Sequence, residues 1–196
     1  MFQVKNYVAA ACVALACAVA APVALAQDVL VVNAQRVLRD SQAGQDMYQK
    51  LQQIGETMQS EMAPEQQALQ TELTSLETRT QGMTAEQIQA DPALVQQLQA
   101  YQRKLQTNAQ KADRRSRELA QTERNALASF SDAMEGAVET VRARRNGQVV
   151  LVDANVYSVT AEADITSEVI TQLNSTTPTI AVTRVTLPAT PAGTPQ

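Results

Sequence analysis

The sequence predicts an α+β fold in which a small β-containing body carries one long antiparallel α-helical hairpin. Two observations predict this fold. Over residues 46–147 the apolar positions follow a helical period out, are interrupted by a turn, and follow it back. The short runs 29–32 and 149–152, on either side of this stretch, contain only Val and Leu, as strands buried on both faces do. Aromatic residues make up 3% of the chain, which fits long solvated helices better than a thick core.

Residues 1–26 have the pattern of a secretory signal peptide. Lys5 supplies the positive start, an uncharged apolar stretch follows, and Ala-Leu-Ala at 24–26 is a typical cleavage site. We expect cleavage after Ala26, with retention as a membrane anchor and lipid attachment at Cys17 as the alternatives. Cleavage would remove both cysteines and leave fifteen basic against twenty acidic residues, a net charge of −5.

The next segment, 27–45, is expected to form the first part of the body. Strand 29–32 is followed by a short helix through Val37 and Leu38, and the polar and small residues at 41–44 predict a break. The hairpin arm, 46–146, should begin at Asp46, because Asp46 and Gln49 match a capping box.

The outgoing leg of the arm has an irregular apolar seam. Two successive steps of four at Met58 and Met62 are followed by Pro64, which has no amide hydrogen. We therefore expect local unwinding or a kink at Pro64, acting as an arm hinge. The tip is placed near 81–91, where Gly82 interrupts the helical pattern. The seam residues are Met47, Leu51, Ile54, Met58, Met62, Leu69, Leu73, Leu76 and Met83.

The return leg is the clearer helix. Asp91 can cap its first amides and Pro92 suits the first helical position, whereas Asn146 and Gly147 predict its end. At about 1.5 Å per residue this helix would be roughly 80 Å long. Its seam residues recur mostly at alternating steps of three and four, as in a coiled coil: Leu94, Leu98, Tyr101, Leu105, Asn108, Ala112, Leu119, Ala126, Ala133, Ala137 and Val141.

The two legs have opposite net charges. Residues 46–91 contain two basic and eight acidic residues, a net charge of −6, whereas 92–147 contain ten basic and six acidic residues, a net charge of +4. This difference favours pairing of the legs, although each exposed ion pair contributes only about 0.2–1 kcal/mol. We interpret Glu118 and Glu123 as solvated acids without a pocket.

The second part of the body is expected at 147–173. It contains strand 149–152, a third strand at 156–159, and a short helix that Asp164 would cap. Two or three short strands cannot bury both of their faces within one small protomer. We therefore predict an oligomer with a shared core at Val29, Val31, Val149 and Leu151.

The tail, 174–196, is rich in Thr and Pro, and we expect it to be partly disordered. Apolar residues alternate over 179–187 with an imperfect phase, which predicts one more strand, and disorder is expected from Pro188 onward.

Two segments resemble the Skp/OmpH family of periplasmic chaperones. They are VVNAQRVL at 31–38 with SQAG at 41–44, and VVLVDANVY at 149–157 followed by DIT at 164–166. The resemblance implies a homotrimer whose three tentacle-like hairpins enclose a cavity. It also implies an ATP-independent holdase that shields unfolded outer-membrane proteins in the periplasm, between the inner-membrane translocon and the outer-membrane assembly machinery. The best-known members are basic, whereas this sequence has a pI near 4.9.

The sequence offers no site for catalysis. It has no His, both cysteines precede Ala26, and no nucleotide-binding motif occurs, so we expect no enzyme activity, no cofactor and no metal. Nucleic-acid binding is disfavoured by the negative net charge and the few aromatic residues. The competing function class is a trimeric coiled-coil structural or adaptor protein of the cell envelope, without chaperone activity.

Two sets of candidate contact residues lie on the arm. Apolar client contacts are expected at Met58, Met62, Leu69, Met83 and Tyr101, and filling of the hairpin seam is the alternative role. The second set resembles a basic stretch of Skp-type chaperones that has been proposed to contact lipopolysaccharide. Ion pairing within the hairpin or between subunits is its alternative role, and its members are Lys111, Arg114, Arg115 and Arg117.

Overall fold

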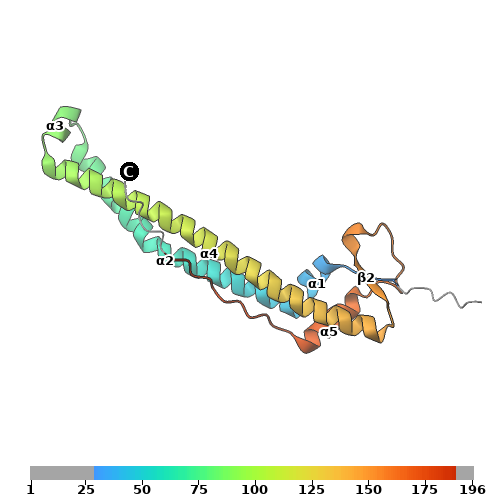
Figure 1. Cartoon of the computed structure of the whole chain (residues 1–196). Coiled ribbons are helices and arrows are strands. Elements are labelled where there is room, and N and C mark those ends of the chain that lie inside the picture. Colours follow the sequence, from blue (N-terminus) through green and yellow to red (C-terminus); the bar gives the residue numbers. More distant parts are fainter. Residues whose placement is uncertain (1–28, 189–196) are drawn as a thin grey trace, which may run out of the picture.

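The computed structural model describes residues 29–188 of the 196-residue chain; the predicted signal peptide and the last residues of the tail lie outside this range. A long helical hairpin projects from a small body at one end (Figure 1). The elements follow in the order β1 (Val29–Val32), α1 (Ala34–Asp40), α2 (Gln42–Thr80), α3 (Ala85–Gln89), α4 (Pro92–Arg144), β2 (Val149–Val152), a 3-10 turn (Asp153–Asn155) and α5 (Thr166–Thr176).

The return leg, α4, begins and ends as the sequence predicted. The Asp91 carboxylate accepts a hydrogen bond from the Leu94 amide at 3.1 Å, and Pro92 occupies the first turn. At the other end Asn146 adopts a φ of 55°, a left-handed conformation that Asn tolerates better than most residues. A Cβ at Gly147 would lie 2.4 Å from Leu30 Cδ1, so a larger residue here would require the Leu30 side chain to move.

The outgoing leg, α2, begins earlier than predicted. Its N-cap is Ser41, whose hydroxyl accepts a hydrogen bond from the Gly44 amide at 3.1 Å. The predicted capping box at Asp46 is therefore wrong, because Asp46 already lies in the second turn. A Cβ at Gly44 would lie 1.8 Å from the Leu38 carbonyl oxygen, so glycine is required for α1 and α2 to meet in so tight a corner.

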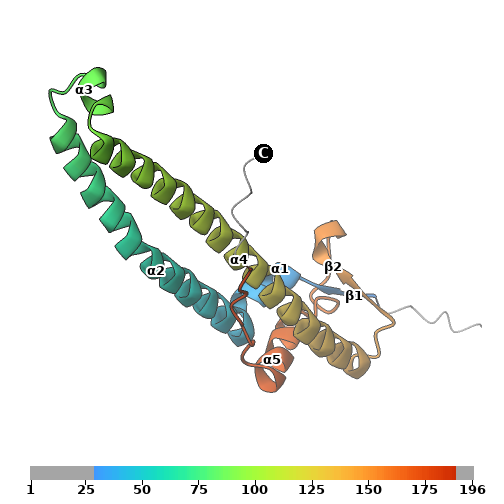
Figure 2. The same cartoon turned by 60° about the vertical axis from the view of Figure 1, so that its left-hand side comes forward.

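Pro64 lies inside α2, and the helix continues through it without a break. The predicted local unwinding is therefore wrong, although Figure 2 shows α2 curved along its length. Proline cannot donate a hydrogen bond to the carbonyl of Ser60, so this turn lacks one helical hydrogen bond. A hinge at Pro64 remains a prediction, because the helix is weakened at this turn.

Pro64→Ala should stiffen the outgoing leg and raise helical content slightly, because it restores the missing hydrogen bond. Spin labels at Gln45→Cys and Thr78→Cys lie on either side of Pro64 on α2, and their distance distribution should narrow in the variant. Gln66→Ala, an exposed change that keeps Pro64, is the control and should leave the distribution unchanged. Equally narrow distributions with and without Pro64 would exclude the hinge.

The tip contains a short helix that the sequence analysis missed. In α3, Thr84 and Gln87 form a capping box, each side chain bonding to the other residue's amide. Arg79 from the end of α2 forms an ion pair with Asp91 at 2.9 Å and donates to the Gln97 side chain at 2.8 Å. These contacts close the hairpin at its far end.

The body contains a two-stranded parallel sheet, in which Val31 of β1 is aligned with Leu151 of β2. The predicted third strand at 156–159 does not form, and Tyr157 is fully exposed there. The other edge of β1 is instead bridged by Asp164 and its neighbours. The Val31 amide donates to the Ala163 carbonyl at 2.8 Å, and the Ile165 amide donates to the Val31 carbonyl at 2.9 Å.

The core lies at the base of the hairpin, where α1, α2, α4 and α5 meet the sheet. One face of α5 packs into this core: Val169 and Leu173 in the helix, and Ile165 at its N-cap, have no exposed surface. They pack with residues from the other helices, including Val37, Met47, Phe130 and Val141.

Candidate functional site

The first candidate surface is the outward side of the β1–β2 pair. Of the four residues predicted to form a shared core, only Val31 is buried within the chain, at 5% exposure. Val29, Val149 and Leu151 are 41%, 42% and 45% exposed. Among residues 29–188 no strand pairs with the free edge of β2. The body therefore presents an uncovered apolar strand to its surroundings.

The predicted client-contact residues lie mostly inside the arm. Met58, Met62 and Leu69 are 4%, 6% and 7% exposed. Met83 and Tyr101 are half-buried. The first three side chains therefore fill the space between the two legs, and a client could contact Met58 and Met62 only if the hairpin or the tail moved.

Each predicted lipid-contact cation has a carboxylate partner within the chain. Lys111 pairs with Glu65 at 2.5 Å, across the two legs. Arg115 bridges the legs as well, and Arg114 approaches a carboxylate of its own helix at 3.8 Å. Arg117 pairs with Asp113 at 2.9 Å on the outer surface, where both side chains are more than half exposed.

Glu118 is completely buried, so its interpretation as a solvated acid is wrong. Arg115 donates to its carboxylate at 2.8 Å, and the Leu187 amide donates to it at 3.0 Å. Burial alone would raise the pKa of Glu118. The hydrogen bonds from Arg115 and Leu187, with the charges of Arg115 and Arg114, outweigh burial and hold that pKa below its usual value. The carboxylate therefore stays ionised beneath the tail.

The tail crosses the arm in an extended form instead of forming the predicted strand. We call residues 177–188 the strap; they follow α5 and contain no regular secondary structure. The strap runs back along the hairpin toward its middle (Figure 1). Its side chains alternate: Ile180 is 3% exposed, Val182 and Arg184 are half-buried, and Ala181 and Thr183 are exposed.

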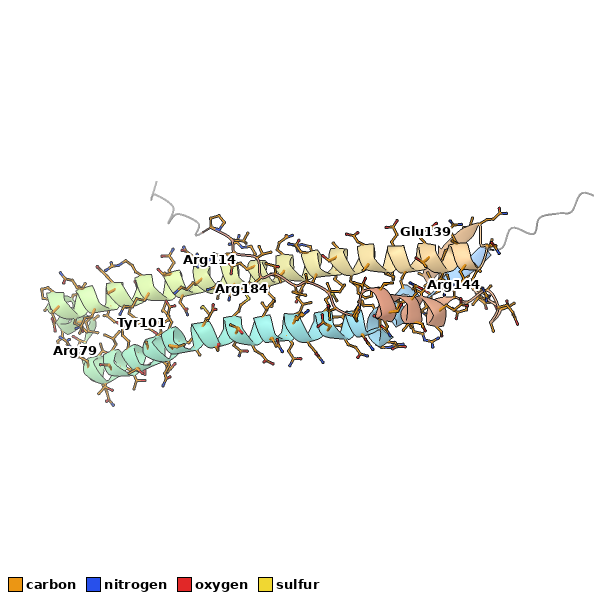
Figure 3. All side chains as sticks on the ribbon, turned by 90° about the horizontal axis from the view of Figure 1, so that it is seen from below. Arg79, Tyr101, Arg114, Glu139, Arg144 and Arg184 are labelled. Atoms are coloured by element: carbon orange, nitrogen blue, oxygen red, sulfur yellow. The ribbon has the colours of Figure 1, made fainter. Side chains whose placement is uncertain are left out.

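The strap binds to both legs. Arg184 forms a two-pronged ion pair with Glu61 of α2, at 2.7 and 2.9 Å. Figure 3 shows Arg184 lying over the space between the legs. The Val185 amide donates to the buried Thr122 hydroxyl of α4 at 3.0 Å. The strap therefore fastens α2 to α4 in the half of the arm nearest the body.

Asp46, wrongly predicted as a helix cap, is the first anchor of the strap. Its carboxylate accepts hydrogen bonds from the Ile180 amide at 2.9 Å and from the Lys50 ammonium at 2.7 Å. The hydrogen bond from Lys50 is the main reason that the pKa of Asp46 lies below its usual value. Lys50 also donates to the Ile180 carbonyl at 2.8 Å, so both polar groups of the Ile180 backbone are bound.

A shallow groove continues the path of the strap toward the tip. Its volume is about 440 Å³, and it lies between the two legs. On α2 the strap contacts Glu61, and the groove begins one turn later at Glu65 on the same helical face. The lining residues are Glu65, Ala68, Leu69 and Glu72 of α2 with Ala100, Arg103, Lys104 and Thr107 of α4.

Two kinds of site are missing from the part of the chain that the structure covers. No three His, Cys, Asp or Glu side chains in residues 29–188 lie close enough together to hold a metal ion. None of the helices in the same range has the length and apolar character required to cross a bilayer.

Comparison with known proteins gives a matching family model and matching solved structures. The family model for outer membrane proteins of the OmpH-like kind matches residues 28–173. A crystal structure of an OmpH-like protein from Caulobacter crescentus CB15, described as a candidate outer membrane chaperone, superposes with a TM-score of 0.72 at 23% sequence identity. The similarity covers 82% of this chain and 91% of that one. No curated protein is significantly similar in sequence. The strap lies beyond the stretch that the family model matches.

Proposed function

This chain belongs to the OmpH-like family of outer membrane proteins, and from that premise we propose that it is an ATP-independent holdase chaperone. Its proposed clients are unfolded outer-membrane proteins, which three arms of a homotrimer would shield in a common cavity. Cleavage after Ala26 would place the protein in the periplasm. The fold shared with the Caulobacter crescentus protein, a candidate outer membrane chaperone, also supports the proposed chaperone role.

The observation that carries this proposal is the uncovered apolar edge of the body. Val149, Leu151 and Val152 of β2 are 42%, 45% and 49% exposed in the single chain. A sheet of two strands is marginal by itself, and an exposed apolar edge strand is prone to pair with another chain. Association of three copies through this edge would cover these residues and leave three arms projecting from one body.

The length of the arm suits a protein that encloses a client without a cycle of ATP hydrolysis. The longer leg has 53 residues, so at about 1.5 Å per residue it is about 80 Å long, and all but its end at the base projects from the body. Ion pairs such as Lys104–Glu72, at 2.8 Å, hold the legs together along this length. A cavity between such arms would keep unfolded chains apart, which a holdase can do by binding alone.

A structural spacer without clients is the second candidate function. Burial of Met58, Met62 and Leu69 favours it, because adaptable apolar side chains that fill the arm are not free to bind a client. This spacer would form the same oligomer and the same arms.

Light scattering separates the two functions. An unfolded β-barrel outer-membrane protein is diluted from denaturant with and without the protein expressed from Gln27 onward. The chaperone should suppress aggregation of several such clients at a small molar excess, whereas the spacer should suppress none. Failure of the intact oligomer with every client tested would lead us to adopt the spacer function.

We expect this protection to persist at moderately raised salt and to be unaffected by ATP. The chain expressed from Gln27 has a net charge of −5, so general attraction for acidic clients cannot be the main force. Exposed charges are screened over about 8 Å at physiological salt, whereas apolar burial is not weakened by salt. Scattering measured with and without ATP across a salt series tests this. Loss of protection at moderate salt would show that charge dominates client capture.

Contact between the basic cluster and an anionic membrane surface, such as lipopolysaccharide, is a separate proposal. It would require Lys111, Arg114 and Arg115 to exchange a carboxylate partner within the chain for a lipid phosphate.

A further inference from the structure

We propose that the strap is a built-in competitor for clients. It occupies the inner part of a track for extended polypeptide that runs along one face of the hairpin. An extended segment of an unfolded outer-membrane protein binds to this track when the strap is displaced. This inference rests on the proposed chaperone function and adds the binding surface and its regulator.

The track recognises main-chain groups, which every polypeptide carries. The amides of Ile180, Val185 and Leu187 donate to side chains of the two legs at 2.9, 3.0 and 3.0 Å. Lys50 supplies the matching donor for the Ile180 carbonyl. Hydrogen bonds to the main chain give affinity without selecting a sequence, as in other sites that bind extended peptides. The same acceptors on the arm can therefore serve an extended segment of another chain.

The side-chain pattern of the strap matches the proposed client class. Ile180 and Val182 point toward the arm, whereas Ala181 and Thr183 between them are exposed. Strands of outer-membrane β-barrels have the same alternation of apolar and polar residues, with a period of two. An unfolded barrel strand in extended form would present the same groups to the track as the strap does.

The strap can be displaced because few of its side chains are buried or ion-paired with the arm. Within residues 177–188 only Ile180 is fully buried, and Arg184 makes the one side-chain ion pair of the described strap. The Arg184 and Glu61 side chains are 24% and 38% exposed, so water can reach the pair. A client that makes the same main-chain bonds can therefore replace the strap with little loss.

The track has an entrance that the strap leaves open. Contacts of the strap with the legs end at Glu61 and Glu118, and the groove begins at Glu65 and Thr107. Leu69 lies at its base, and Lys104 pairs with Glu72 across it. A client segment that lies in this groove would meet the end of the strap and could displace it from that end inward.

The test locks or loosens the strap in the chain expressed from Gln27, which has no natural cysteine. Ile54 and Val182 line the same hollow between α2 and the strap, so Ile54→Cys/Val182→Cys can be bridged by a short bis-maleimide. Arg184→Glu replaces the ion pair with Glu61 by repulsion and loosens the strap. Matched controls are Arg184→Lys, which keeps the charge, and each single-cysteine variant treated with the same reagent.

Binding of a fluorescently labelled unfolded β-barrel protein is measured for each variant. The bridged protein should bind it about tenfold more weakly than its unbridged form, and Arg184→Glu should bind it roughly three- to tenfold more tightly. Hydrogen exchange over residues 179–187 reports whether the strap has been released, and sedimentation reports whether the oligomer persists.

Equal affinity of the bridged and unbridged proteins would overturn the competitor proposal, because the client would then not need the strap to move. Weaker or unchanged binding by Arg184→Glu with a released strap would also overturn it and would show that the strap only braces the legs. If neither the natural sequence nor any variant binds clients, the chaperone proposal fails together with it. If all of them bind clients equally, only the competitor proposal fails.

Discussion

Leu151→Asp should prevent the protein from forming its oligomer. Leu151 is 45% exposed in the single chain, so in a protein that stayed monomeric this surface change should alter stability by only about 0.5 kcal/mol. In an oligomer built through β2, the same carboxylate would be buried without a partner. Such a charge costs on the order of several kcal/mol in each protomer, which is a large part of the stability of a small body. A loss of several kcal/mol in stability would therefore indicate the oligomer, and a change of about 0.5 kcal/mol would indicate a monomer.

Sedimentation equilibrium is the measurement. The natural sequence from Gln27 onward should have three times the protomer mass, and Leu151→Asp should have the protomer mass with reduced thermal stability. Leu105→Asp is the matched control, because Leu105 has nearly the same exposure, 43%, but lies on the arm. It should remain a trimer. A folded monomer of the natural sequence at micromolar concentration, or a Leu151→Asp protein that is still trimeric, would contradict the architecture.

The parts of the fold that sequence reasoning predicted correctly depend on local contacts. The start of α4 at Asp91 involves a hydrogen bond to a residue three positions later, and its end at Asn146 and Gly147 involves a turn of similar size. The apolar period of the legs is likewise a property of neighbouring turns. These signals can be recognised without knowing what else the chain contacts.

The errors occur where a distant segment decides the outcome. Asp46 matches a capping box locally, but its carboxylate binds Ile180, 134 residues further along the chain. Glu118 lies on a polar helical stretch, and its burial depends on Leu187, 69 residues away. Both residues are anchors of the strap. The alternation of apolar residues over 179–187 predicted a strand, but it did not indicate which part of the chain this segment would contact.

The strand predictions show the same limit. The run 156–159 is apolar enough for a strand, but the edge of β1 that it would have joined is bridged by Asp164. Val29, Val149 and Leu151 were expected to be buried because both faces of their strands are apolar, yet each is more than two-fifths exposed in the single chain. A pattern of apolar residues predicts that a strand is covered, but it does not tell whether the covering residues belong to the same chain or to another copy. The trimer therefore stays a prediction.

Removal of the outer half of the arm should abolish protection of clients while leaving the body folded. Deletion of residues 66–110 joins Glu65 to Lys111, and these two residues already pair across the legs at 2.5 Å. A short Gly-Asn-Gly turn can therefore close the shortened hairpin. The strap anchors Glu61 and Glu118 lie on the body side of the cut, so the inner half of the arm keeps its contacts.

The shortened protein should sediment as the same oligomer as the intact chain, because β1 and β2 are untouched. It should fail to suppress aggregation of unfolded β-barrel proteins, since it lacks the groove at Leu69 and the outer half of the arm that would enclose a client. Replacement of 82–90 alone by a short turn is the control. That change removes α3 but keeps Asp91 as the cap of α4, and it should preserve most of the protection. If the shortened protein protected clients as well as the intact one, the body and the inner half of the arm would be sufficient for binding, and shielding between full-length arms would be the wrong mechanism.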